Sequence, residues 1–284
     1  MNYEVKMNHD LGRSLVVDGT TIKWDVAGAG PDLVLVHGNG ANHAWWGPLE
    51  GLLAGRYRLT LLDLSGHGDS DHRDQYEPRF WVNEVRAVMA ASEVTDPFLV
   101  GHSMGGRVVL SLAAEHPDEL AGLMLFDTSI RPADRYRDFQ RREHRPPPVY
   151  PTKEAAAARF RLKPEQPHPG PEVMAPLAEK ALKRTAEGWT WKYDHRALMR
   201  FTDAGVDAAA RLVTAPMAYV WASGSVVVDD DLADYVMKVV QGPVTPARVE
   251  DAYHHVILDQ PKVCARLIDE FVYSLRGTAE RDAV

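Results

Sequence analysis

The stretch Val100-Gly101-His102-Ser103-Met104-Gly105-Gly106 decides the fold of this 284-residue chain. An apolar run at 97–100 leads into it, and residues 107–114 leave it with helical character. Residues 101–105 fit G-x-S-x-G, the spacing of a nucleophile elbow, which is a sharp turn between a buried strand and a helix. Such a turn holds the serine hydroxyl clear of the sheet, and its glycines let neighbouring backbone approach closely. The pattern predicts that Ser103 is a nucleophile.

The composition is that of an ordinary globular protein. Hydrophobic residues make up 45% of the chain and charged residues 25%, and the net charge of −8 argues against a nucleic-acid partner. The one cysteine, Cys264, has no partner for an internal disulfide, which is typical of a reducing compartment. Residues 1–10 lack the apolar core of a signal peptide, and no apolar run approaches the ~20 residues that span a bilayer. We expect a cytoplasmic protein without a membrane partner, and its oligomeric state is left open.

Short apolar runs alternate with segments of helical spacing along most of the chain. Fully apolar runs are typical of strands buried on both faces of a sheet. The alternation therefore predicts an α/β fold, with a mainly parallel sheet and helices on both faces. The expected strands are a hairpin at 15–26, then 33–36, 57–63, 97–100, 120–127, 217–221 and an edge strand with its loop at 249–255; the expected helices are 80–91, 107–114, 231–240 and 261 to about 275, before a polar tail at 276–284.

The composition and the hydrophobic pattern of the sequence change between residues 130 and 211. Residues 131–145 are dense in charge, Pro146-Pro147-Pro148 is a rigid break, and no strand alternation is visible. We therefore expect a core of residues 1–129 and 212–284, with a helical cap at 130–211 inserted over the carboxyl ends of the strands. The helices expected in the cap are 154–161, 174–184 and 194–200.

The loops at 37–40, Ser103, Asp127 and His254-His255 are expected at the carboxyl ends of strands, where open α/β sheets bind ligands. Four sequence motifs include most of these residues. Together and in this chain order, they resemble the α/β-hydrolase superfamily over roughly residues 19–275. The resemblance implies the α/β-hydrolase fold and a catalytic triad built on the elbow. The motifs are His37-Gly38-Asn39-Gly40, Asp63-Leu64-Ser65-Gly66-His67-Gly68-Asp69-Ser70, Gly101-His102-Ser103-Met104-Gly105-Gly106 and His254-His255-Val256-Ile257-Leu258-Asp259-Gln260-Pro261.

A nucleophilic serine needs a base, because an unassisted hydroxyl is a poor nucleophile at neutral pH. Two adjacent histidines, His254 and His255, compete for that role. In the family that the chain resembles, the base commonly stands seven residues before the proline that opens the last helix, which is Pro261 here. We therefore assign the base to His254. For His255, the simpler interpretation is a neighbour that packs between sheet and helix or hydrogen-bonds to backbone.

The triad acid is where this sequence departs from the common pattern. Most members carry it in a Gly-x-x-Asp turn that here reads Ala222-Ser223-Gly224-Ser225, so that Ser225 stands in the acid position. A serine hydroxyl could orient the histidine ring but cannot balance its positive charge. Some members carry the acid after the preceding strand, where Asp127 stands, and we assign the acid to Asp127. Asp229 is the alternative, although residues 229–231 look more like a helix N-terminus.

Two further sets of residues complete the expected site. The oxyanion hole should consist of the backbone N–H of Met104, which follows the nucleophile, and by resemblance that of Asn39. Trp45, Trp189 and Trp191 could line an apolar substrate pocket, although packing between core and cap is an equally good interpretation.

These assignments imply a serine hydrolase of the carboxylesterase type, which cleaves a small carboxylic ester or lactone through an acyl-enzyme and needs no metal or cofactor. A carbon–carbon bond hydrolase of ring-fission products is an alternative on the same scaffold, and a ligand receptor with little turnover is another. Relatives with epoxide hydrolase or haloalkane dehalogenase activity attack with an aspartate at the elbow, so Ser103 argues against those activities.

Overall fold

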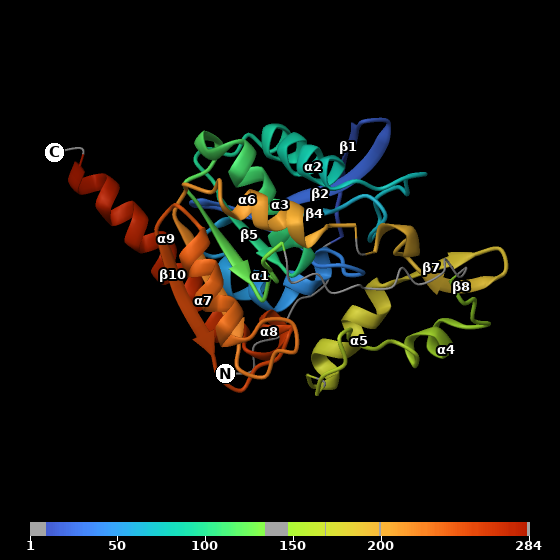
Figure 1. Cartoon of the computed structure of the whole chain (residues 1–284). Helices are drawn as coiled ribbons and strands as arrows, with labels where there is room; N and C mark the ends of the chain where they lie inside the picture. Colours follow the sequence, from blue (N-terminus) through green and yellow to red (C-terminus); the bar gives the residue numbers. More distant parts are fainter. Residues whose placement is uncertain (1–9, 134–146, 168, 199, 283–284) are drawn as a thin grey trace.

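The centre of the molecule is an eight-stranded sheet, in the order β1-β2-β4-β3-β5-β6-β9-β10. The computed structural model describes residues 10–133, 147–167, 169–198 and 200–282. β1 (Arg13–Val17) and β2 (Thr20–Gly28) form the expected hairpin, β2 pairs antiparallel with β4 (Arg58–Asp63), and every pairing from β4 to β10 is parallel. Helices lie on both faces of this sheet (Figure 1). The predicted α/β fold is therefore confirmed.

The predicted elements of the core are present, with boundaries that differ by a few residues. The remaining strands of the sheet are β3 (Asp32–Val36), β5 (Phe98–His102), β6 (Gly122–Phe126), β9 (Met217–Ala222) and β10 (Val244–Val249). The helices of the same part of the chain are η1 (His43–Trp46), α1 (Gly47–Leu53), α2 (Pro78–Ala91), α3 (Met104–Glu115), η2 (Pro117–Glu119), α7 (Asp230–Val239), α8 (Val256–Asp259) and α9 (Pro261–Asp282).

Two predictions near the carboxyl end of the chain were wrong. The edge strand is β10, and most of the expected segment 249–255 forms the loop between β10 and α8. Pro246 obscured this strand, but a proline is tolerated at a sheet edge, where its missing N–H costs no ladder bond. Helix α9 also continues to Asp282 through the expected polar tail. It projects away from the body of the molecule there, so it needs no apolar face (Figure 1).

The insert between β6 and β9 is not purely helical, so that prediction was wrong in part. Its described elements include a hairpin, whose strands pair antiparallel. The charged Lys183 and Arg184 broke the apolar alternation by which a strand is recognised in sequence. The charged stretch at 134–146 lies outside the described residues, and the boundaries of the cap stay a prediction. The elements are α4 (Lys153–Ala157), α5 (Pro171–Lys180), β7 (Leu182–Thr185), β8 (Gly188–Trp191), η3 (His195–Ala197) and α6 (Asp203–Ala210).

Two apolar layers, one on each face of the sheet, form the core. In β3, Val34 and Val36 belong to one layer, whereas Leu33 and Leu35 belong to the other. Successive side chains of a strand point to opposite faces, so each strand contributes to both layers. Side chains of α2, α3, α6 and α7 complete the first layer, and those of α1, α8 and α9 complete the second.

A buried ion pair holds the loop that follows β4. The guanidinium of Arg73 donates to Glu84 Oε1 at 2.9 and 3.1 Å, and also to the backbone carbonyls of Val17 and Asp18. The second carboxylate oxygen of Glu84 accepts the backbone N–H of Ser65 at 2.8 Å. Glu84 is fully buried, and this burial raises the pKa of its carboxyl. The pair thus ties the loop to the first hairpin and to α2.

We expect Arg73→Met to destabilise the protein by about 3–5 kcal/mol, because it leaves the carboxylate of Glu84 buried without its charged partner. Urea unfolding followed by circular dichroism measures the effect, and Arg73→Met with Glu84→Gln should recover part of it. The exposed pair of Arg79 and Glu77 is the control, and Arg79→Met should leave the unfolding midpoint near that of the wild type. Equal midpoints for the two arginine variants would contradict a structural role for the buried pair.

Candidate active site

Ser103 occupies a strained turn between β5 and α3. Its backbone has φ 54° and ψ −116°, which a non-glycine residue rarely adopts. A Cβ atom at Gly105 would lie 2.1 Å from the carbonyl oxygen of Val36, and one at Gly101 would lie 2.6 Å from the backbone of Gly105. Only glycine therefore allows α3 to pack this closely on the sheet. The turn has the geometry that the G-x-S-x-G spacing predicts.

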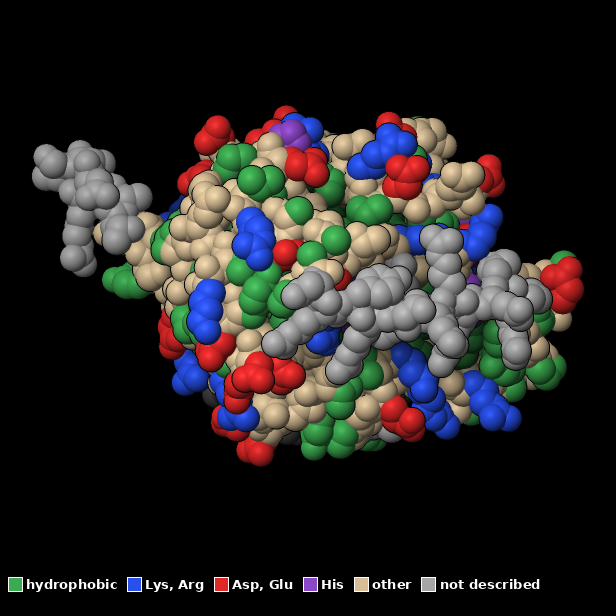
Figure 2. Space-filling model, in the orientation of Figure 1, with side chains coloured by type: hydrophobic (Ala, Val, Ile, Leu, Met, Phe, Trp, Pro, Cys, Tyr) green, Lys and Arg blue, Asp and Glu red, His purple; other side chains and the backbone are tan. Residues whose placement is uncertain are grey.

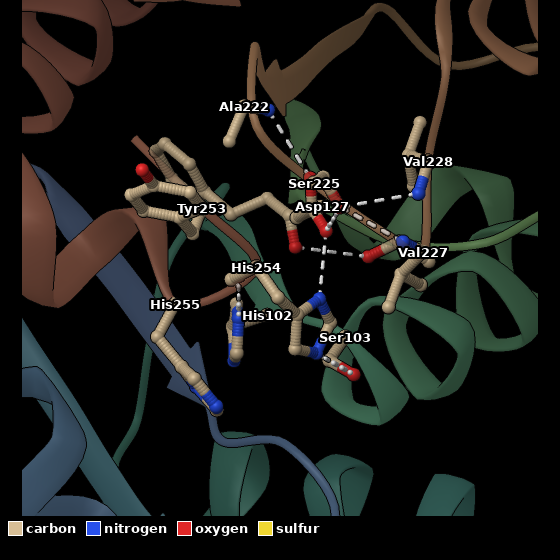
Figure 3. A network of polar contacts seen from close by, with 12 residues as sticks. His102, Ser103, Asp127, Ala222, Ser225, Val227, Val228, Tyr253, His254 and His255 are labelled. Carbon is tan, nitrogen blue, oxygen red and sulfur yellow. Dashed lines mark hydrogen bonds and ion pairs between the residues drawn. The ribbon is translucent and has the colours of Figure 1, made fainter. Parts of the chain in front are cut away.

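Three side chains from distant parts of the chain meet at this turn (Figure 3). Nδ1 of His254 lies 2.7 Å from Oδ2 of Asp127, and Nε2 of His254 lies 3.1 Å from Oγ of Ser103. Because Nδ1–H donates to the carboxylate, Nε2 presents a lone pair to the serine hydroxyl. The structure thus brings together the three residues assigned from sequence as nucleophile, base and acid.

Asp127 is held in place by donors besides His254. It follows β6 directly, is fully buried and has φ 46°. Its Oδ1 accepts the backbone N–H of Ala222 at 3.1 Å, and its Oδ2 accepts the hydroxyl of Ser225 at 2.6 Å. The Ser225 oxygen in turn accepts the N–H groups of Val227 and Val228. Ser225 therefore orients the carboxylate rather than the histidine ring, contrary to the role considered from the sequence.

The alternative acid, Asp229, lies at the N-terminus of α7. Its Oδ1 accepts the backbone N–H of Leu232 at 2.8 Å, which is the contact of a helix N-cap. Its neighbour Asp230 accepts the indole N–H of Trp221. The structure thus gives Asp229 the contact of a helix N-cap, and it places Asp127 against His254.

Two further histidines surround His254 (Figure 3). The ring of His102 lies 5.0 Å from that of His254, and its Nε2–H donates to the His254 carbonyl at 2.9 Å. The Nε2–H of His255 donates to the carbonyl of Lys163 at 3.2 Å. Burial lowers the pKa of His102 to about 3, and it also lowers that of His255 far below its ordinary value. Both rings are therefore neutral, and their hydrogen bonds hold the loop of His254 in place.

The loop that carries Asn39 lies directly against the elbow. A Cβ atom at Gly38 would lie 3.3 Å from Cβ of Ser103, and Gly40 has φ +69°. His37 fixes the loop, since Nδ1–H donates to the Gly38 carbonyl at 2.8 Å and Nε2 accepts the N–H of Leu64 at 3.1 Å. The arrangement suits two backbone donors beside Ser103, at Asn39 and at Met104 (the first residue of α3), and their assignment as oxyanion hole stays a prediction.

The three tryptophans considered for a pocket lie in different surroundings. Trp45 is buried and packs edge-on against Phe160 of the insert, with ring centroids 5.8 Å apart. Trp191 is buried within the insert, and Trp189 is half-buried beside the amino group of Lys153. Trp45 thus joins core and insert by packing, and a role of these residues in binding substrate stays a prediction.

Sequence reasoning missed two polar side chains that hold the loop of His254, namely Gln166 and Asp259. Asp259 bonds the backbone N–H of Tyr253, and Gln166 bonds that of His255. Asp259 stands inside the quoted motif and was not singled out there. Gln166 lies in the insert, outside every motif, so the sequence carried no signal for it.

Other features of the described residues bear on possible ligands. No group of three or more His, Cys, Asp or Glu side chains among them is arranged to hold a metal ion. None of the helices in the described ranges combines the length and the apolar character needed to cross a bilayer. The face seen in Figure 2 mixes acidic and basic side chains rather than presenting one sign of charge.

Comparison with solved structures shows the same fold in other proteins. A crystal structure of an esterase from Mycobacterium tuberculosis superposes with a TM-score of 0.71, covering 92% of this chain and 90% of that one at 22% identity. At this identity, the likeness concerns the fold alone.

Curated relatives match over shorter stretches. A pimeloyl-(acyl-carrier protein) methyl ester esterase of Aeromonas hydrophila is 40% identical over 103 residues, which are 36% of this chain and 39% of that protein. A 2-hydroxymuconate semialdehyde hydrolase of a Pseudomonas species is 32% identical over 125 residues, which are 42% of this chain and 44% of that protein. The chain therefore spans less than half the length of these relatives.

The model of one protein family, described as the alpha/beta hydrolase family, matches residues 33–267. This range runs from β3 to α9 and includes the elbow, the strand ends and the loop of His254. The chain belongs to the alpha/beta hydrolase family.

Proposed function

We propose that this protein is a serine hydrolase that cleaves a carboxylic ester or lactone through an acyl-enzyme. The observation that carries the proposal is the hydrogen-bonded chain from Ser103 through His254 to Asp127. Its order and its distances are those of a nucleophile, a general base and the carboxylate that orients the base. A relative named as a methyl ester esterase, 40% identical over 36% of this chain, is consistent with this reaction.

The geometry supports a two-step reaction. In the first step, His254 Nε2 takes the proton of Ser103 as Oγ attacks the substrate carbonyl, and Asp127 stabilises the imidazolium. The N–H groups of Met104 and Asn39 bind the negative oxygen of the tetrahedral intermediate. His254 then returns the proton to the leaving alkoxide, and the acyl group stays on Ser103. In the second step, His254 Nε2 takes a proton from water as the water oxygen attacks the acyl carbonyl. The ester bond to Ser103 Oγ then breaks, His254 returns the proton to Oγ, and the carboxylic acid leaves.

A second candidate reaction is cleavage of a carbon–carbon bond beside a carbonyl. It is favoured by the relative named 2-hydroxymuconate semialdehyde hydrolase, which matches 42% of this chain. Parallel assays with aryl esters, lactones and ring-fission diketones separate the two reactions, since both use the same three side chains but differ in the bond that breaks.

We expect a fluorophosphonate probe to label the protein at Ser103, because the probe reacts with a serine whose proton is taken by a neighbouring base. The same preparation should hydrolyse a short-chain aryl ester such as p-nitrophenyl butyrate. In Ser103→Ala, labelling should vanish, and kcat should fall on the order of 10⁶-fold. Mass spectrometry of the labelled peptide locates the adduct. A wild-type protein that is neither labelled nor active would sink the proposal and leave the ligand-receptor alternative.

We expect Asp127→Asn to lower kcat/KM by about 10⁴-fold, because an amide favours the wrong histidine tautomer and cannot balance the imidazolium charge. Asparagine tolerates the positive φ of this position, so the fold should survive. Asp229→Asn is the matched control and should keep its activity, since asparagine caps a helix as well as aspartate does. The reverse order of the two activities would assign the acid to Asp229.

A carboxylate at position 225 offers a rescue of Asp127→Asn. Ser225 Oγ lies 2.6 Å from the carboxylate oxygen that His254 uses, so Ser225→Asp brings a carboxylate to nearly the same place. Combined with Asp127→Asn, it should raise kcat/KM about tenfold or more above that of Asp127→Asn alone. No recovery in a folded double variant would show that a carboxylate at position 225 fails to reach the ring.

We expect His102 and His255 to stay uncharged in assays between about pH 5 and pH 7, because burial lowers the pKa of both rings. Neither ring should therefore exchange a proton in this range, and the slope of log kcat/KM against pH should nowhere exceed one. Initial rates of aryl ester hydrolysis across this range measure the slope. A slope of two would mean that a second histidine must lose its proton for activity.

A further inference from the structure

The loop that carries His254 is held by the insert as well as by the core. Gln166 stands between α4 and α5, and its Oε1 accepts the backbone N–H of His255 at 3.0 Å. The Nε2 group of the same side chain donates to both carboxylate oxygens of Asp259, at 3.1 Å each. A residue of the insert thus bonds directly to the residue that follows the base.

Asp259 binds the backbone on the N-terminal side of His254. The carboxylate oxygen Oδ2 of Asp259 accepts the backbone N–H of Tyr253 at 2.8 Å. The N–H groups immediately before and after His254 are therefore bound by two side chains that also bond to each other. The carbonyl of His254 is bound separately by His102, at 2.9 Å. These contacts leave the backbone of the base little freedom to turn relative to Ser103.

The neighbouring residues of the insert are anchored to the core at the same place. Leu162 is buried in the apolar layer that contains α1 and α8, and Phe160 packs against Trp45. The carbonyl of Lys163 accepts the ring N–H of His255. The segment 160–166 therefore packs on the core next to His254. Its polar contacts are made with the loop that carries His254.

We propose that Gln166 is a positioning residue, which aligns His254 with Ser103 and makes this alignment depend on the docking of segment 160–166. The inference rests on the proposed function, because it assigns His254 the role of base. The position requires an acceptor toward His255 and a donor toward Asp259, and an amide side chain supplies both. A carboxylate at position 166 would keep the acceptor but place a second negative group against Asp259, whose pKa burial already raises.

The test compares four variants with the wild type. Gln166→Glu should lower both kcat for p-nitrophenyl butyrate and the rate of fluorophosphonate labelling by about tenfold to a hundredfold, because small misplacements of a catalytic group have effects of this size. KM should change by less than about twofold. Gln166→Glu combined with Asp259→Asn should recover most of the loss, since the amide and the carboxylate then exchange places. Asp259→Asn alone is the reference for this double variant. Gln241→Glu is the matched control, because Gln241 is exposed and donates to the backbone carbonyl of Arg211, the residue after α6.

The outcomes separate a positioning role from a structural one. Assays run well below the melting temperature of each variant, and a lower melting temperature with unchanged kcat and labelling rate would overturn the inference. A double variant no faster than Gln166→Glu would overturn it as well. If the wild type labels and turns over while Gln166→Glu matches it, only this inference fails. If the wild type does neither, the proposed function fails and takes the inference with it.

Discussion

The carboxylate of Asp127 is the group on which the arrangement of the site depends. It is fully buried, and a buried charge is costly unless hydrogen bonds satisfy it. Its donors are the N–H of Ala222 at the end of β9, the hydroxyl of Ser225 in the following turn and the ring of His254. Two other parts of the chain, the end of β9 with its turn and the loop of His254, must therefore be placed correctly beside β6 before the carboxylate is stable. The same placement brings His254 to Ser103.

The parallel pairing of β6 with β9 explains how a carboxylate can stand beside His254 at either strand end. Phe126 of β6 is the register partner of Val220 of β9, so the residues that follow these strands share one space beside the loop of His254. A carboxylate from either strand end can occupy that space, but two charged ones would repel each other there. In this chain Asp127 supplies the carboxylate, and Ser225 fills the other position with a neutral donor. The neutral hydroxyl of Ser225 thus complements the negative charge of the Asp127 carboxylate.

Sequence predicted what depends on local pattern and missed what depends on distant contacts. The apolar runs identified the buried strands, and the glycine spacing identified the elbow of Ser103, because a Cβ at Gly101 or Gly105 cannot fit. Family motifs then pointed to His254 and Asp127. The hairpin β7–β8 and the role of Gln166 were out of reach, since they arise from packing between residues far apart in the chain, such as Gln166 with His255. No periodicity marks such a contact.

Contacts from two parts of the molecule, the core and the insert, restrain His254. Core residues fix the ring through Asp127 and the carbonyl through His102. The insert fixes the following N–H through Gln166, which is bonded to Asp259 and so to the preceding N–H. A ring held only at Nδ1 could still rock about that bond, and Nε2 would then move away from Ser103. Hydrogen bonds to the backbone on both sides limit this motion, so the insert contributes to the geometry of His254 without supplying any of the side chains of Ser103, His254 and Asp127.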